Sequence, residues 1–356
     1  MKRPILFTGG GSAGHVVANI ALIAALKEQG YEVCYVGSYH GIERELITRQ
    51  QIPYTAIATG KWRRYFSYKN FFDLFKVAFG IVQSLWVLLK LRPKLVFSKG
   101  GFVGFPVVVA AKLLRIPVII HEADLTPGLA NRLSFILASK ICVSFSETLN
   151  YFRNRDKVIV TGLPLRKELF LGNAEKGLEL CGFTAEKPLL LVFGGSLGAA
   201  KINQTIRALL PKILEQYNVA HVCGAHGIDN NLQFKGYCMF SYLHEEFPDL
   251  LAAASLVVAR AGANTVCELI ALQKPSILLP LGKEMSRGDQ ILNAEYSVRH
   301  GASKMILDHE LTPETLWQAI NSVKDHLNEM KNACQKIALP NATATITNLI
   351  MTEIGG

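Results

Sequence analysis

Two glycine-rich segments of this chain have the residue types and spacing to bind phosphate. Gly9-Gly10-Gly11-Ser12-Ala13-Gly14 follows an apolar run at residues 4–8, and Gly194-Gly195-Ser196-Leu197-Gly198 follows another at 189–193. A strand that turns tightly into a helix directs backbone N–H groups and the positive end of the helix dipole at one point, which suits phosphate. Glycine lets the backbone turn there and lets an anion approach closely. Two such loops, at the start and the middle of one chain, predict two α/β domains facing each other across a cleft.

The residues around the first loop suggest what chemistry it serves. His15 follows Gly14 directly, and a helix N-terminus disfavours the imidazolium, so His15 is a candidate neutral base, with a packing or capping histidine as the alternative. The spacing Gly9-x-Gly11-x-x-Gly14 also fits the dinucleotide fingerprint, which requires an acid at the end of the second strand. That strand ends Val36-Gly37-Ser38, and its only acid lies at the other end. A nicotinamide-dependent Rossmann dehydrogenase therefore remains an alternative, for which the glycines match the fingerprint and the acid does not.

The elements that must position these loops alternate along the chain. Strand-like runs occupy residues 5–8, 32–36, 95–98, 118–121, 140–143 and 158–161, and after Gly162 the pattern restarts at 189–193, 219–223, 238–240, 256–259 and 276–279. Helical patterns separate them, notably at residues 15–29, 41–50, 202–217, 263–272 and 289–300. Such alternation predicts mostly parallel sheets with crossover helices, in two Rossmann-like α/β domains.

Length and composition agree with two domains in a reducing compartment. The 356 residues exceed one ordinary core, and 50% are hydrophobic. The seven cysteines form no C-x-x-C pair and mostly lie in apolar runs, which favours buried free thiols over disulfides or zinc. The apolar start after Lys2-Arg3 ends at Gly9, which is too short for a signal peptide.

The net charge of +10 is concentrated in one segment. Nine basic residues lie between Lys61 and Lys99 against a single acid, Asp73, interleaved with aromatics. This mixture predicts a surface that lies on an anionic membrane rather than on nucleic acid, for which no recognition motif is present. The residues that we expect to contact the membrane are Trp62, Arg63, Arg64, Phe66, Phe71, Phe72 and Phe75.

The apolar run that follows this segment is expected to stay within the protein. The uncharged residues 77–89 cover only ~20 Å as a helix, against ~30 Å of hydrocarbon, so we expect no membrane span. For residues 81–91 we expect a buried helix with solvated lysines at its ends.

Several further motifs occur in a fixed order. They are Gly10-Gly11-Ser12-Ala13-Gly14-His15, Lys99-Gly100-Gly101-Phe102, His121-Glu122-Ala123-Asp124, Gly162-Leu163-Pro164-Leu165-Arg166, Gly194-Gly195-Ser196-Leu197-Gly198-Ala199, Arg260-Ala261-Gly262-Ala263-Asn264-Thr265-Val266-Cys267-Glu268 and Asp289-Gln290-Ile291-Leu292-Asn293-Ala294. Together they resemble the MurG family of glycosyltransferases over nearly the whole chain. The resemblance implies a twin-Rossmann (GT-B) fold and inverting transfer of GlcNAc from UDP-GlcNAc to the C4 hydroxyl of MurNAc in undecaprenyl-linked lipid I. It also implies a peripheral enzyme at the cytoplasmic face of the bacterial membrane. A UDP-hexosamine epimerase shares this fold and remains a further alternative.

The resemblance also assigns domains and site residues. Residues 1–163 with a returning helix in 341–356 would bind the acceptor and the membrane, and residues 164–340 would bind UDP-GlcNAc. His15 would be the base, with Asp124 as a second candidate because His121-Glu122-Ala123-Asp124 replaces the His-Glu-Gln-Asn of many members. The implied donor-binding residues are Ser12, Arg166, Gly195, Ser196, Glu268, Gln290 and Asn293, and those for the acceptor pyrophosphate are Gly10, Gly11, Gly14, Gly100 and Gly101. No Asp-x-Asp pair occurs in the sequence, so we expect no metal and no cofactor.

Overall fold

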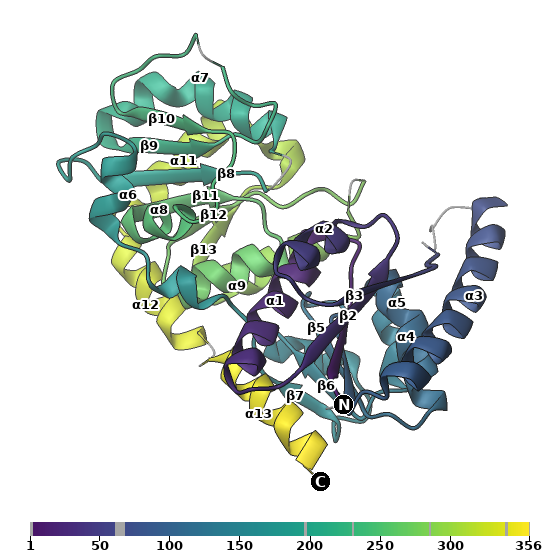
Figure 1. Cartoon of the computed structure of the whole chain (residues 1–356). Coiled ribbons are helices and arrows are strands. Elements are labelled where there is room, and N and C mark those ends of the chain that lie inside the picture. Colours follow the sequence, from purple (N-terminus) through teal and green to yellow (C-terminus); the bar gives the residue numbers. More distant parts are fainter. Residues whose placement is uncertain are drawn as a thin grey trace. The chain divides into compact units, whose positions relative to one another are not determined.

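The chain folds into two α/β units, each built on a parallel sheet (Figure 1). The computed structural model describes residues 3–60, 68–195, 198–229, 231–284, 286–338 and 341–355, without the side chains of residues 68–72. The N-terminal unit comprises Met1–Arg166 and Leu339–Gly356, and the C-terminal unit comprises Lys167–Ala338. The division after Arg166 lies close to the expected boundary after residue 163.

The sheet of the N-terminal unit has the strand order β3-β2-β1-β4-β5-β6-β7, and its described pairs are parallel. Its central strands are buried on both faces, which explains why they read as unbroken apolar runs. The strands are β1 (Ile5–Thr8), β2 (Val33–Ser38), β3 (Tyr54–Ile57), β4 (Leu95–Ser98), β5 (Val118–Glu122), β6 (Lys140–Val143) and β7 (Val158–Val160).

Helices cover both faces of this sheet. They are α1 (Ala13–Glu28), α2 (Ile42–Arg49), α3 (Tyr68–Leu91), α4 (Gly101–Leu113), α5 (Leu129–Phe135) and the 3-10 helix η1 (Ser146–Tyr151). The last helix, α13 (Ala342–Gly355), returns to this unit and packs against α1. Its buried Ile346 and Ile350 join the same core as Val16 and Leu22 of α1. On the other side of the sheet, α3 packs against α4, and α4 packs against α5.

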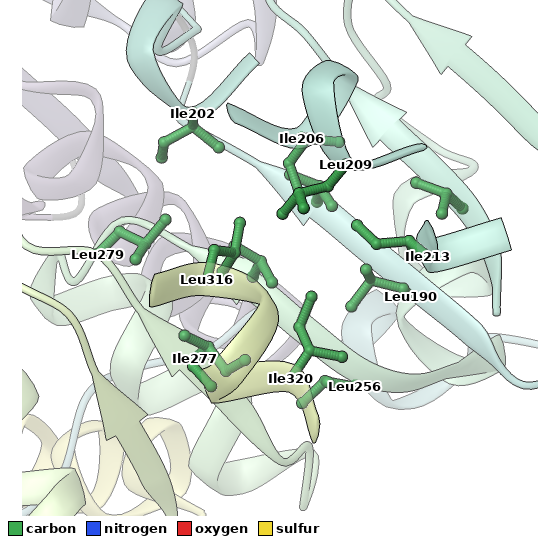
Figure 2. Packing of buried hydrophobic residues seen from close by; sticks show 14 of the residues in the cluster. Leu190, Ile202, Ile206, Leu209, Ile213, Leu256, Ile277, Leu279, Leu316 and Ile320 are labelled. Carbon is green, nitrogen blue, oxygen red and sulfur yellow. The ribbon is translucent and has the colours of Figure 1, made fainter. Parts of the chain in front are cut away.

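The C-terminal unit repeats the arrangement with strand order β10-β9-β8-β11-β12-β13. Its strands are β8 (Leu189–Phe193), β9 (Asn218–Val222), β10 (Tyr237–Phe240), β11 (Ala254–Ala259), β12 (Ser276–Leu278) and β13 (Ser303–Met305). Its helices are η2 (Lys167–Phe170), α6 (Ala174–Leu180), α7 (Ala200–Gln216), α8 (Phe247–Ala253), α9 (Ala263–Ala271), α10 (Asp289–Arg299), η3 (Asp308–Glu310), α11 (Pro313–Lys324) and α12 (Leu327–Ile337). Figure 2 shows the core, where Ile206 and Ile213 of α7 meet Leu316 and Ile320 of α11 over strand residues such as Leu190.

The helix α3 differs from the sequence prediction. Residues 81–91 were expected to be buried, but Val82, Trp86 and Leu89 are 61%, 63% and 59% exposed. With Phe75 and Phe79 they form one stripe at helical spacing. The opposite face, with Ser84, Val87 and Leu88, is buried, which makes α3 a helix half covered by its own unit.

Candidate functional site

Two glycine turns of the N-terminal unit pack directly on one another at the carboxyl ends of β1 and β4. Gly11, Gly100 and Gly101 have φ values of 85°, 86° and 76°, which other residues rarely adopt. A β-carbon on Gly101 would lie 2.5 Å from the carbonyl oxygen of Gly10, and one on Gly11 would lie 2.7 Å from the ring of Phe102. The five glycines predicted to bind the acceptor pyrophosphate thus belong to two neighbouring loops, with Gly14 in the first turn of α1.

His15 is the third residue of α1 and is partly buried, with its Nδ1 atom shielded from solvent. It lies close enough to the buried His121 to contribute to that residue's electrostatic environment. His121 Nε2 lies 2.8 Å from the carbonyl oxygen of Gly162, so Nε2 donates and Nδ1 accepts from Lys99 Nζ at 2.5 Å. Burial, followed by the charge of Lys99, lowers the pKa of His121 well below its usual value. This histidine is therefore neutral.

Lys99 is wholly buried at the start of the second glycine turn. Its backbone N–H donates to the carbonyl oxygen of Thr8 at the end of β1, and its side chain reaches His121 on β5. Lys99 is one of the nine basic residues of the segment 61–99, but its side chain is not part of the surface. From the sequence alone, a lysine that follows an apolar strand can be either exposed to solvent or buried against the neighbouring strand.

Asp124 lies in the β5–α5 loop, which a buried carboxylate organises. Glu122 accepts hydrogen bonds from the backbone N–H groups of Asp124 and Gly128, both at 3.1 Å, and from Asn131 Nδ2 at 2.8 Å. Burial, and then the charge of Asp124, raises the pKa of Glu122 to about 7. Asp124 itself is only half buried.

A second buried carboxylate lies beneath the first glycine loop. Glu43, in the first turn of α2, accepts from Ser38 Oγ at 2.5 Å, from the Ser38 N–H at 3.2 Å and from the Gly11 N–H at 3.4 Å. A β-carbon on Gly10 would lie 2.6 Å from Glu43 Cδ, so the carboxylate touches this loop. The sequence pattern did not indicate this acid, because the dinucleotide fingerprint requires an acid at the end of β2, whereas the Glu43 carboxylate reaches that point from the next helix.

In the C-terminal unit, the glycine loop after β8 packs against a network of buried polar residues. Gly195 and Gly198 have φ values of 94° and 75°, and a β-carbon on Gly198 would lie 2.3 Å from the Cys223 carbonyl oxygen. Asn203 of α7 donates to that same oxygen at 2.9 Å and accepts from the buried His221 at 3.0 Å. Ser196, a predicted donor-binding residue, lies outside the described residues.

The remaining donor-binding candidates lie after β11 and β12. Glu268 is half buried in the second turn of α9. Gln290 Oε1 accepts from the Leu281 N–H at 3.0 Å, while Asn293 is wholly buried and its amide lies 3.4 Å from the Ala261 carbonyl oxygen. Both helical residues thus lie beside strand ends of this sheet.

A further residue that the sequence analysis left without a role joins the ends of β11 and β12. Arg260 Nη1 contacts Asp308 Oδ1 at 2.6 Å and donates to the Leu279 carbonyl oxygen at 2.9 Å. Lys201 of α7 donates to the carbonyl of the same Asp308. The cluster fixes the strand ends around the predicted donor site.

Two predicted donor-binding residues belong to the N-terminal unit. Ser12 is the exposed N-cap of α1, and its side chain makes no capping hydrogen bond. Arg166 is the last residue of this unit's first segment, and its Nε is a buried donor with no hydrogen-bond partner among the described residues. An unsatisfied buried donor is costly, and an anionic ligand would satisfy it.

The predicted membrane residues are only partly described. Trp62, Arg63, Arg64 and Phe66 lie outside the described residues, as do the side chains of Phe71 and Phe72. Phe75 is 60% exposed at the start of the stripe on α3. Its neighbour Asp73, the one acid of the basic segment, is buried and pairs with Lys76 at 3.3 Å.

The described residues include one long apolar helix and no cluster of metal ligands. One helical segment, Asp73–Leu91, is long and apolar enough to cross a bilayer by length and composition alone, because α3 extends beyond the uncharged run. Within the described ranges, no group of three or more His, Cys, Asp or Glu side chains is arranged to hold a metal ion.

Comparison with known proteins identifies the family. Residues 5–143 match the glycosyltransferase family 28 N-terminal domain, and residues 189–346 match its C-terminal domain. A protein of Lachnoclostridium phytofermentans named UDP-N-acetylglucosamine–N-acetylmuramyl-(pentapeptide) pyrophosphoryl-undecaprenol N-acetylglucosamine transferase is 54% identical, covering 95% of this chain and 96% of its own. A Legionella pneumophila (strain Paris) protein with the same name is 49% identical, covering 98% and 97%.

A solved structure agrees with these relatives. The crystal structure of Acinetobacter baumannii MurG superposes with a TM-score of 0.78 at 26% identity, covering 99% of this chain and 100% of that one. The resemblance stated from the motifs is thereby confirmed. This chain belongs to glycosyltransferase family 28, among the MurG N-acetylglucosaminyltransferases.

Proposed function

We propose that this chain transfers GlcNAc from UDP-GlcNAc to the C4 hydroxyl of MurNAc in undecaprenyl-linked lipid I, which forms lipid II for peptidoglycan synthesis. The observation that carries this proposal is the near full-length identity of 54% to a relative named for such a transfer. Hydride transfer and epimerisation are not favoured, because the curated relatives matched over nearly the whole chain carry the transferase name.

The chemistry is a single displacement. The C4 hydroxyl attacks the anomeric carbon of GlcNAc from the face opposite UDP, the new C–O bond forms, and the bonding pair of the old one leaves on the diphosphate. The hydroxyl proton passes to a base, since an alcohol is a poor nucleophile at neutral pH. His15 is our candidate, supported by its place at the N-terminus of α1 and beside neutral His121. The half-buried Asp124 is the second candidate.

The donor residues have distinct roles in this proposal. In the N-terminal unit, the unsatisfied Arg166 Nε and the Ser12 hydroxyl are our candidates for binding the leaving diphosphate. In the C-terminal unit, the candidate is the glycine loop that follows β8 and contains Gly195. The carboxylate of Glu268 accepts from the ribose hydroxyls, and Gln290 and Asn293 contact hydroxyls of the GlcNAc ring. No step in this scheme requires a metal.

The acceptor and the membrane meet on the N-terminal unit. The exposed stripe of α3, Phe75, Phe79, Val82, Trp86 and Leu89, would lie in the headgroup region with Lys76 and Lys90 beside anionic lipid. Because the opposite face of α3 packs on its own unit, we propose that this helix lies on the membrane rather than across it. The helix α4, which packs on α3, begins at Gly101 of the acceptor loops, so a membrane-anchored lipid would reach them along it. The enzyme is thus peripheral, at the cytoplasmic face of the bacterial membrane.

One experiment tests the central proposal. Purified protein is incubated with UDP-[14C]GlcNAc and a short-chain lipid I analogue, with and without EDTA, and labelled product is separated by chromatography. We expect transfer in both conditions. Absence of transfer without EDTA overturns the proposed function, whereas transfer that EDTA abolishes overturns only its independence from metal.

A further inference from the structure

The first glycine loop is bound from inside the N-terminal unit by two side chains that the proposed function does not use. The Tyr35 hydroxyl on β2 donates to the carbonyl oxygen of Gly9 at 2.7 Å. It accepts in turn from Asn19 Nδ2 of α1 at 3.1 Å, and the same amide donates to the carbonyl oxygen of Thr8 at 3.2 Å. Tyr35 and Asn19 are both 0% exposed. Burial raises the pKa of Tyr35 above its usual value, so the hydroxyl keeps the proton that it donates.

This contact sets the direction of the peptide that joins Gly9 to Gly10. Gly9 has a φ of 142° and Gly11 one of 85°, which glycine adopts as readily as many other conformations, so the residue types of the loop do not select one of them. The peptide is trans, and a planar trans peptide holds its C=O and its N–H on opposite sides. Because the Gly9 carbonyl is bound to Tyr35, the Gly10 N–H is directed away from that side chain.

The two glycine turns meet at this same peptide. A β-carbon on Gly101 would lie 2.5 Å from the carbonyl oxygen of Gly10 and 3.8 Å from its nitrogen. The next N–H along the chain, that of Gly11, donates to Glu43 Oε2 at 3.4 Å. The protein therefore binds the Gly9 carbonyl and the Gly11 N–H from one side, and the Gly10 amide lies between them beside the second turn.

We infer that Tyr35, supported by Asn19, is a positioning residue for the acceptor: its hydroxyl holds the Gly9–Gly10 peptide so that the Gly10 N–H donates to the acceptor diphosphate. This inference rests on the proposed function for the identity of the acceptor. Backbone N–H groups stabilise an anion best when they are fixed before it arrives, because ordering a glycine loop costs free energy. Since Tyr35 is wholly buried, it orders the loop without touching the ligand.

A neighbouring tyrosine provides a matched control. The Tyr54 ring stacks on that of Tyr35 with centroids 5.9 Å apart, and its hydroxyl donates to the carbonyl oxygen of Ser38 at 2.6 Å. Tyr35→Phe and Tyr54→Phe each remove one tyrosine hydrogen bond to a backbone oxygen, so both should lower the unfolding midpoint. Of the two hydroxyls, that of Tyr35 bonds to the glycine loop. Tyr35→Phe should therefore weaken binding of a prenyl diphosphate about tenfold, as for one N–H bond to a charged group, and Tyr54→Phe by less than about twofold.

Calorimetry on the full chain measures the binding of farnesyl diphosphate, with saturating UDP in the donor site and below the unfolding midpoint of every variant. UDP itself should bind to Tyr35→Phe within about threefold of the wild type, because most of its candidate contacts lie in the C-terminal unit. Equal losses of probe binding in the two tyrosine variants, or unchanged binding by Tyr35→Phe, overturn the inference. A loss of UDP binding as large as that of the probe, or no binding of the probe to the wild type, overturns it as well.

A second variant covers the case in which Tyr35→Phe does not fold. Asn19→Ala keeps the tyrosine but removes the amide that orients its hydroxyl, and should weaken probe binding about threefold. Unchanged binding by Asn19→Ala then overturns the inference. Transfer of labelled GlcNAc to the lipid I analogue by the wild type is measured separately. If probe binding follows these expectations but no GlcNAc is transferred, the proposed function fails and the positioning of a diphosphate through Tyr35 stands.

Discussion

The apolar stripe of α3 allows a prediction whose size follows from the exposed area. Trp86 and Phe79 are 63% and 58% exposed, so each leaves roughly 120 Å² of an aromatic side chain of about 200 Å² in water. At ~25 cal/mol per Å², full burial of both would contribute ~6 kcal/mol. A helix that lies in the interface immerses about half of this area, which leaves ~3 kcal/mol. Replacing both residues by serine should therefore weaken vesicle binding about 100-fold.

Sedimentation with vesicles that contain anionic lipid measures this loss directly. The matched control is Leu171→Ser, because Leu171 is 78% exposed but belongs to the C-terminal unit. Its binding should stay within twofold of the wild type, and the thermal unfolding midpoint should change little in either variant. Equal losses in the α3 variant and in the control, or wild-type binding by the α3 variant, would refute the assignment of the stripe to the membrane.

Three further predictions concern the two units separately. His15→Ala should lower turnover at least 100-fold while the dissociation constant of UDP-GlcNAc changes little, whereas equal losses would indicate Asp124 as the base. Gly101→Ala, whose β-carbon would lie 2.5 Å from a backbone oxygen at φ 76°, should cost ~2 kcal/mol or more of unfolding free energy by denaturant titration, against ~1 for Gly30→Ala at φ 81° in open space. Burial lowers the pKa of His221 from 6.5 to about 3, so the unfolded state binds a proton that the folded state does not, and stability should fall by about 1.4 kcal/mol per pH unit below pH 6.5. His221→Gln should flatten that dependence, and an unchanged slope would contradict it.

Strands that read as apolar runs could be predicted from the sequence, including the edge strands β7 and β10, and the two more polar edge strands could not. The strands β1, β4, β6 and β8 are found at the predicted residues, since each reads as a continuous apolar run. The strands β3 and β13 were missed. They are edge strands of three or four residues, Tyr54–Ile57 and Ser303–Met305, that mix polar with apolar side chains, and their hydrogen bonds to a neighbour define them more than their composition does.

Composition also does not show which face of a helix is buried and which is exposed. Residues 81–91 are apolar enough to be buried, yet Trp86 and Leu89 face outward because α4 and the end of β3 cover only the other side. A β-carbon on Gly80 would lie 2.1 Å from the Ala58 carbonyl oxygen, which shows how closely that side is packed. Which face finds a partner depends on contacts between distant segments, and these become visible only in the fold.

The buried Glu43 also explains why the glycine spacing of a dinucleotide fingerprint does not produce a dinucleotide site here. In dinucleotide sites an acid at the end of the second strand accepts the ribose hydroxyls. Here a carboxylate does lie at the end of β2, but it is wholly buried and accepts from Ser38 and from Gly11 of the glycine loop itself. A ribose would have to displace both contacts and uncover a buried charge, which is costly. An acid therefore does lie where the fingerprint requires one, but the ribose of a nucleotide cannot reach it. Its carboxylate binds the glycine loop instead.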